Sequence, residues 1–196
     1  MKNRLDLSQL YNTVFEEHQD VLKKTRNECY ADIMAMHLCW LSAIRSGRKI
    51  LFFGNGGSAS DCQHLATELT VRFRKNRSPI SAVALTTDSS ALTAIGNDMG
   101  FENLFSRQLE AIGELGDIAV GISTSGKSAN VIKGLEIARK KGMKPVGFTG
   151  CGGGEIRELA NPLIVVPSYS TARIQEMHIL IGQCLCEALE IDLGLV

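Results

Sequence analysis

Short apolar runs alternate with longer helical patterns through most of this chain. Five runs have the length and apolar character of buried strands: 49–53, 81–85, 117–122, 144–148 and 162–166. Helical patterns follow them at about 59–74, 89–96, 102–112, 128–141, 153–159 and 172–190. Because parallel strands are joined by crossover helices, the alternation predicts an α/β fold. We expect a doubly wound, flavodoxin-like sheet of five parallel strands with helices on both faces.

A helical pattern also precedes the first predicted strand. Apolar residues recur at helical spacing between Leu10 and Ile44, and Gly47 ends the pattern. We therefore expect an N-terminal helical arm at residues 1–46 and one globular domain at residues 47–196. A domain of this size can bury a large core.

Composition narrows the ligand classes. The 21 Lys and Arg residues balance 21 Asp and Glu residues, so the chain has no net charge with which to attract nucleic acid. No apolar stretch reaches the roughly 20 residues that span a bilayer, and the polar start MKNRLDLSQ is not typical of a signal peptide. The six cysteines form no CxxC pair, which is typical of reduced thiols. The composition thus favours a cytoplasmic protein with a small-molecule ligand.

The third predicted strand runs directly into a loop of hydroxyl side chains. In DIAVGISTSGKSAN (117–130), Ser123, Thr124, Ser125 and Ser128 surround Gly126. A strand that turns into a helix through such residues offers hydroxyls, free backbone N–H groups and a positive helix end to one point in space. That combination suits a phosphate dianion. The segment predicts a binding site for the phosphate of a sugar phosphate.

The same segment also matches the nucleotide P-loop pattern G-x-x-x-x-G-K-S from Gly121 to Ser128. However, Ile122 continues the apolar strand, so the expected loop is short. No predicted strand ends in a convincing Mg²⁺-binding aspartate either. A nucleotide hydrolase or kinase is therefore the weaker alternative.

A glycine-rich turn, GNGGSAS (54–60), follows the first predicted strand. It contains the dinucleotide pattern G-x-G-x-x-A, but the ribose-binding acid is missing, because Asp88 lies too far beyond the second strand. The better interpretation is a tight turn whose backbone amides approach a polar ligand, with Ser58 capping the next helix. A purely structural turn is the alternative.

Two helices carry further candidate residues. His64 and Glu68 lie four residues apart and share one helix face, where they can bind one divalent metal, or Glu68 can act as a general base. On the C-terminal helix, Gln175 and Gln183 lie about 80° apart and can line one cleft, with His178 one turn beyond Gln175. The simpler alternatives are an intrahelical contact in the first case and incidental polar residues in the second.

Together and in this order, these segments resemble the SIS-type phosphosugar-binding domains, and most closely the phosphoheptose isomerase family. The stretches that carry the resemblance span most of residues 49–187: GNGGSASDCQHLATEL, LTTDSSALTAIGND, FSRQ, GISTSGKSANV, GFTG and ARIQEMH. The resemblance implies a homotetramer with active sites between subunits. It also implies interconversion of sedoheptulose 7-phosphate and its aldose through an enediol, the first step of ADP-heptose synthesis for lipopolysaccharide.

The resemblance assigns roles residue by residue. It implies that the phosphate is bound by Ser123, Thr124, Ser125 and Ser128. It implies that the sugar is contacted by Asn55, Gly56, Gly57, Ser58, Asn97, Asp98 and Gln175. Zinc-bearing relatives hold the metal through the positions of His64, Glu68 and Gln175, and Glu68 doubles as the base that moves a proton between C1 and C2.

The chain departs from the family at one position. A second histidine usually lies eight residues beyond Gln175, where it completes the metal site and acts as the partner acid–base, but this chain has Gln183 there. Glutamine cannot titrate and is a poor zinc ligand, so we expect weaker zinc binding. The departure also raises an alternative, a non-catalytic relative that binds the DnaA replication initiator and lacks the same histidine. Because Glu68 and both loops are retained, the enzyme is favoured.

Overall fold

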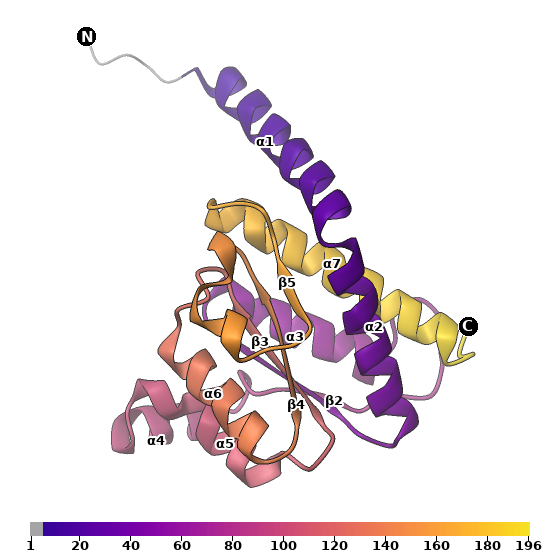
Figure 1. The fold of residues 1–196 in the computed structure, drawn as a ribbon, viewed down its shortest axis with the longest axis vertical. Helices are drawn as coiled ribbons and strands as arrows, with labels where there is room; N and C mark the ends of the chain where they lie inside the picture. The colour runs from indigo at the N-terminus through magenta and orange to yellow at the C-terminus, as the bar shows by residue number, and fades with distance from the viewer. Residues whose placement is uncertain (1–5) are drawn as a thin grey trace.

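Five parallel strands form one sheet at the centre of the structure (Figure 1), a computed structural model that describes residues 6–196. The strand order is β2-β1-β3-β4-β5. All five predicted strands are confirmed: β1 (Ile50–Gly54), β2 (Ala82–Ala84), β3 (Ile118–Ser123), β4 (Lys144–Thr149) and β5 (Leu163–Val165). The predicted doubly wound, flavodoxin-like architecture is therefore confirmed.

Helices cover both faces of the sheet. They are α1 (Leu7–Glu28), α2 (Tyr30–Arg45), α3 (Gly57–Thr70), α4 (Ser89–Asp98), α5 (Leu104–Ile112), α6 (Ala129–Lys140) and α7 (Thr171–Asp192). The buried residues of α2, α3 and α7 pack on one face, and those of α4, α5 and α6 pack on the other. Two short 3₁₀ segments, η1 (Phe101–Asn103) and η2 (Cys151–Glu158), complete the described elements.

Successive side chains of β1 point to opposite faces of the sheet and contribute an aromatic ring to the core on each face. Phe52 points toward α2, where the ring of Trp40 meets it edge-on at 5.5 Å between centroids. The neighbouring Phe53 points to the other face and packs on Phe105 of α5 at 5.4 Å. Strands buried on both sides need apolar residues at every position, which explains the unbroken apolar runs in the sequence.

The N-terminal helical pattern divides into two helices with different roles. Cys29 separates α1 from α2, and its thiol donates a hydrogen bond to the carbonyl of Val165 at 3.2 Å, which fixes the break to edge strand β5. Trp40 and Met36 of α2 are fully buried against the sheet. By contrast, α1 extends beyond the rest of the molecule (Figure 1). Residues 1–5 of the predicted arm lie outside the described residues.

One predicted helix is wrong in type. The segment at 153–159 lies in η2 and not in a regular α-helix. Gly152, Gly153 and Gly154 all have positive φ, a conformation that interrupts a right-handed helix and that glycine adopts at low cost. The glycines therefore produce a tight, irregular loop after β4.

Within residues 6–196, no helix combines the length and the apolar character needed to cross a membrane.

Candidate active site

The direction in which successive strands are added to the sheet reverses between the adjacent strands β1 and β3. β1 connects outward to β2, whereas β3 connects in the opposite direction to β4, so the loops after β1 and β3 meet at a switch point. The register pairs Gly54 with Ile122, one residue before Ser123. We call residues 55–58 the glycine loop and residues 123–128 the hydroxyl loop. The topology places these two predicted ligand-binding loops side by side.

The hydroxyl loop is closed by its own hydrogen bonds. The Oγ atoms of Ser123 and Ser128 lie 2.9 Å apart, and the amide of Gly126 donates to the carbonyl of Ser123 at 3.1 Å. Ser128 precedes α6 but makes no side-chain capping bond, so it does not occupy the first N–H groups of that helix. Hydroxyls and helix N–H groups are therefore available to an anion at one place.

The loop is too short for a nucleotide P-loop. Ile122 and Ser123 belong to β3, and only four residues lie between that strand and Ser128. Among them Thr124 is half-buried, whereas Ser125 is exposed. A single phosphate group fits this size better than a nucleotide triphosphate.

The glycine-rich segment at the start of η2 is hydrogen-bonded to the hydroxyl loop. The amide of Gly150 donates to the carbonyl of Thr124 at 3.0 Å, and the amide of Glu155 donates to the carbonyl of Gly126 at 2.9 Å. A Cβ atom added at Gly126 would overlap the carbonyl of Gly153. The sequence signal that could have found this contact is the glycine cluster GCGGG at 150–154, part of which was predicted to be helical.

An amide pair joins the two loops. Asn55 and Asn130 exchange two hydrogen bonds of 2.8 Å each through their side-chain amides, and Asn130 is only 2% exposed. Sequence reasoning missed Asn130, because its partner lies 75 residues away. Asn55 therefore has a structural partner in addition to its predicted contact with the sugar, which stays a prediction.

The predicted cap of α3 is wrong. Gly56, at φ +55°, precedes the helix, and Ser58 lies within its first turn with a buried side chain. Because glycine takes positive φ without strain, Gly56 serves as the cap and α3 begins two residues earlier than a cap at Ser58 would allow.

Gln175 lies at the glycine loop, whereas Asn97 and Asp98 make no hydrogen bond to that loop within residues 6–196. A Cβ atom added at Gly57 would come within 2.6 Å of Gln175 Nε2, so α7 reaches the start of α3. Asn97 donates to Asp98 at 2.7 Å at the exposed end of α4, and within residues 6–196 neither bonds to another candidate residue. Their predicted contact with the sugar stays a prediction.

A second group of candidate residues lies further along α3 and α7. His64 Nε2 is 3.0 Å from Glu68 Oε1, and Gln183 Nε2 is 3.4 Å from the same His64 nitrogen. Glu68 is partly shielded, with 22% of its side chain exposed. His64 follows Gly57 by seven residues, a rise of about 10 Å along the helix. The structure thus brings the three residues together but separates them from the glycine loop.

The donor atoms of this group do not match a tight zinc site. Only the His64 imidazole and the Glu68 carboxylate are strong zinc ligands, while Gln175 and Gln183 contribute neutral amides. In the part of the chain that the structure describes, no three His, Cys, Asp or Glu side chains cluster as metal ligands. Structural zinc almost always has four strong ligands, so this set suits weak binding at most.

His178 is a core residue. It is 1% exposed, its Nε2 donates to the carbonyl of Thr149 at 3.1 Å, and its ring meets Phe148 edge-on. Burial lowers the pKa of His178 to about 4, so the imidazole is neutral near pH 7. His178 is therefore not placed to replace the missing histidine.

Asp61 is a carboxyl group that sequence reasoning did not select. It lies on α3, one turn before His64, and within residues 6–196 its buried Oδ2 atom has no hydrogen-bond partner. Burial raises the pKa of Asp61 from 3.8 to about 6, and the positive charge of nearby His64 opposes the rise. The folded protein therefore binds this proton more tightly than the unfolded chain.

The pKa of Asp61 gives a pH prediction. Between about pH 4 and pH 6 the folded state holds the proton that the unfolded state has lost, so this contribution to stability decreases as pH rises through that window. Asp61→Asn removes the ionisation, and we expect its melting temperature to exceed that of the wild type increasingly from pH 4 to pH 7. Thermal unfolding across this range measures the effect. Parallel curves for the two proteins would contradict it.

Comparisons with known proteins identify the family of the chain. The family model for the SIS domain matches residues 14–150. The phosphoheptose isomerase of Paramagnetospirillum magneticum is 51% identical over 174 residues, covering 89% of this chain and 91% of the relative. The structure of phosphoheptose isomerase GmhA from Neisseria gonorrhoeae is 40% identical with a TM-score of 0.89, covering 94% of this chain and 99% of that one. The phosphoheptose isomerase structure from Francisella tularensis is 34% identical with a TM-score of 0.91, covering 96% and 100%. The chain therefore belongs to the phosphoheptose isomerase family of SIS-domain proteins.

Proposed function

We propose that the chain is an aldose–ketose isomerase that interconverts sedoheptulose 7-phosphate and D-glycero-D-manno-heptose 7-phosphate. Membership of the phosphoheptose isomerase family supports this activity. The observation that carries the proposal is a pair of features at one edge of the sheet. The hydroxyl loop lies at the switch point, and α3, the helix that follows β1, bears the partly shielded carboxylate of Glu68. The DnaA-binding alternative finds no support in the comparisons.

Each group of site residues has its own proposed role in the reaction. The hydroxyls of Ser123, Thr124, Ser125 and Ser128 hold the phosphate and fix one end of the sugar. Glu68 removes a proton from C1 of the ketose and returns it to C2 of the enediol, which leaves the aldose. The amide of Gln183 can donate a hydrogen bond to a sugar oxygen, but it carries no titratable proton. The proton that moves between O1 and O2 therefore does not pass through Gln183.

We also propose a homotetramer with active sites between subunits. The glycine loop and the group of His64, Glu68 and Gln183 are separated along α3, so a second subunit can complete the site. Large apolar side chains on α1 are exposed, among them Tyr11 at 59% and Phe15 at 69%. Because α1 extends beyond the rest of the molecule, these side chains can pack against other subunits (Figure 1).

We also propose a biosynthetic pathway and a cell compartment for the reaction. The product would enter ADP-heptose synthesis for lipopolysaccharide, and the enzyme would work in the cytoplasm. All six cysteines are free, which supports a reducing compartment. The partner molecule is a phosphorylated heptose, and neither nucleic acid nor a membrane is required.

We propose that zinc binds weakly, through His64 and Glu68 with amide help from Gln175 and Gln183. Gln183→His would add a strong ligand beside His64, and we expect zinc affinity to rise by about 10- to 100-fold. Competition with a chromogenic chelator measures the affinity, and Gln183→Asn is the control because it keeps an amide. Equal affinity of the Gln183→His variant and the wild type would place residue 183 outside the metal shell.

Turnover of purified protein tests the proposed activity. We expect conversion of sedoheptulose 7-phosphate to the aldose, measured by NMR of the sugar carbons, and no conversion of unphosphorylated sedoheptulose at the same concentration. A protein that converts neither sugar, with or without added zinc, would contradict the proposal.

A further inference from the structure

A buried ion pair contacts the helix turn that carries Glu68. Arg77 Nε donates to Glu190 Oε1 at 2.8 Å, and the two side chains are only 1% and 2% exposed. Arg77 belongs to the segment that follows α3, and Glu190 belongs to α7. The pair therefore links the two helices that hold the group of His64, Glu68 and Gln183.

The guanidinium of Arg77 also binds the end of α3. Its Nη2 donates to the carbonyl of Glu68 at 2.8 Å, and its Nη1 donates to the carbonyl of Leu69 at 2.7 Å. Because α3 ends at Thr70, these carbonyls have no partner within the helix. The Leu69 carbonyl also accepts the amide of Ile80 at 3.0 Å, so within residues 6–196 the Glu68 carbonyl is the one that Arg77 alone holds. Helix ends fray when such groups are left to solvent, so Arg77 fixes the turn from which Glu68 projects.

Glu190 anchors the same region to α7. Besides Arg77, it accepts the amide of Phe73 at 2.8 Å. Burial alone raises the pKa of Glu190, but the hydrogen bonds from Phe73 and Arg77 and the charge of Arg77 lower it overall, so the carboxylate stays ionised near pH 7. Glu190 lies seven residues, or about two turns, after Gln183 on α7. One carboxylate thus ties the end of α3 to the helix that carries Gln183.

Stability alone gives a poor reason for this arrangement. Removing two charges from water is unfavourable, and apolar residues of similar size often stabilise a core equally well. We infer that Arg77 and Glu190 are positioning residues for the reaction: they hold the last turn of α3 against α7 so that Glu68 stays beside His64 and Gln183. This inference rests on the proposed function.

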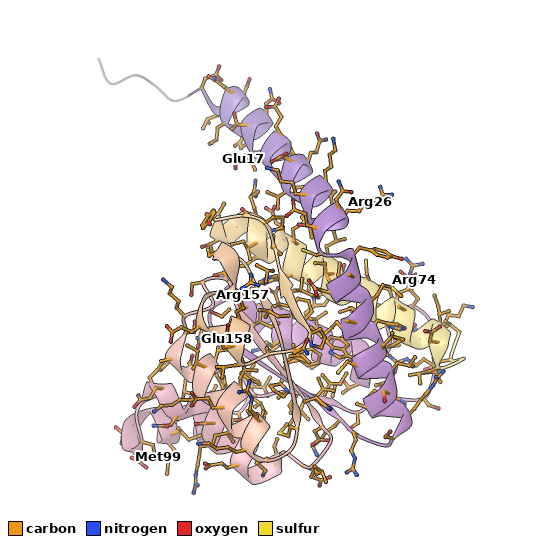
Figure 2. All side chains as sticks on the ribbon, in the orientation of Figure 1. Glu17, Arg26, Arg74, Met99, Arg157 and Glu158 are labelled. Atoms are coloured by element: carbon orange, nitrogen blue, oxygen red, sulfur yellow. The ribbon has the colours of Figure 1, made fainter. Side chains whose placement is uncertain are left out.

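The chain contains a matched control pair. Arg74 Nη1 and Glu187 Oε1 lie 2.9 Å apart, with the same chemistry and one turn earlier on α7. Their side chains are 70% and 37% exposed, and Arg74 is among the labelled surface side chains in Figure 2. In residues 6–196 the Arg74 side chain makes no hydrogen bond to the end of α3. Arg74→Lys therefore makes the same chemical change in an exposed ion pair without releasing the turn that carries Glu68.

Arg77→Lys is the deciding variant, because lysine keeps the positive charge but lacks the fork that reaches the two carbonyls. We expect kcat for sedoheptulose 7-phosphate to fall by about 10- to 100-fold, since small misplacements of a catalytic group cost this much. KM should change by less than about twofold, because the phosphate contacts are untouched. Hydrogen exchange of amides in the last turn of α3 should accelerate. Arg74→Lys should leave all three measurements unchanged.

The double variant Arg77→Met with Glu190→Met separates positioning from stability. Because the double variant leaves no unpaired buried charge, we expect it to lose less thermal stability than Arg77→Met or Glu190→Met alone, while kcat falls as in Arg77→Lys. Wild-type kcat in Arg77→Lys would overturn the inference, as would an equal loss in Arg74→Lys. If the wild type itself fails to turn over the sugar, the proposed function is wrong. Amide exchange still decides in that case whether Arg77 fixes the turn.

Discussion

Glu68→Gln is expected to reduce turnover of sedoheptulose 7-phosphate by about 10²- to 10⁴-fold, the range for loss of a general base. Glutamine has nearly the same shape as glutamate but cannot accept the proton from C1. The carboxylate lies 3.0 Å from His64 and 22% of its side chain is exposed, so it is partly shielded at the site. Steady-state kinetics with the purified variant measures the loss.

Binding should survive this substitution. Since the hydroxyl loop is untouched, calorimetry should give the Glu68→Gln variant an affinity for sedoheptulose 7-phosphate within about threefold of the wild type. Glu187→Gln is the control, because it makes the same chemical change on the exposed side of α7. Turnover by Glu68→Gln at the wild-type rate would remove Glu68 from the mechanism.

Gly126→Ala is expected to weaken binding of the same sugar by about 10- to 100-fold, the loss that follows from removing one charge-assisted hydrogen bond. Gly126 has φ +65°, and a new Cβ would overlap the carbonyl of Gly153 and lie 3.0 Å from the Cα of Gly154. Both contacts are backbone atoms of a segment that is itself bonded to the loop. The hydroxyl loop must therefore move away from η2. Calorimetry with sedoheptulose 7-phosphate measures the affinity.

Gly152→Ala provides the matched control for this change. Gly152 also has positive φ, at +76°, but nothing lies within 4 Å of an added Cβ. It therefore carries the same conformational strain without the collision, and its affinity for the sugar should be close to that of the wild type. If Gly126→Ala bound as tightly as Gly152→Ala, the hydroxyl loop would not be the phosphate site.

The fold was predictable because its strands are buried on both faces. β1 and β3 need apolar side chains at every position, and this leaves continuous runs that helical surfaces do not produce. The division of the N-terminal helices at Cys29 was not predictable, because the helical pattern continues through it and the break depends on a contact with Val165. The irregular η2 segment depends on three glycines at positive φ, which the helical periodicity concealed.

The site was predictable where local sequence determines local geometry. The hydroxyl loop and the pairing of His64 with Glu68 follow from neighbouring residues, and both are present. Asn130 and Arg77 could not be selected, because their partners lie 75 and 113 residues away in the sequence. The burial of Asp61 likewise depends on the packing of the folded chain, not on its own position in the helical pattern.

Proton exchange in D₂O tests the central claim most directly, because it requires both a bound phosphate and a working base. Sedoheptulose 7-phosphate incubated with the wild-type protein should acquire deuterium at C1, seen by NMR, while unphosphorylated sedoheptulose should exchange at least about 10²-fold more slowly, since it lacks the remote binding energy of the phosphate. Equal exchange of the two sugars, or none in either, would contradict the account.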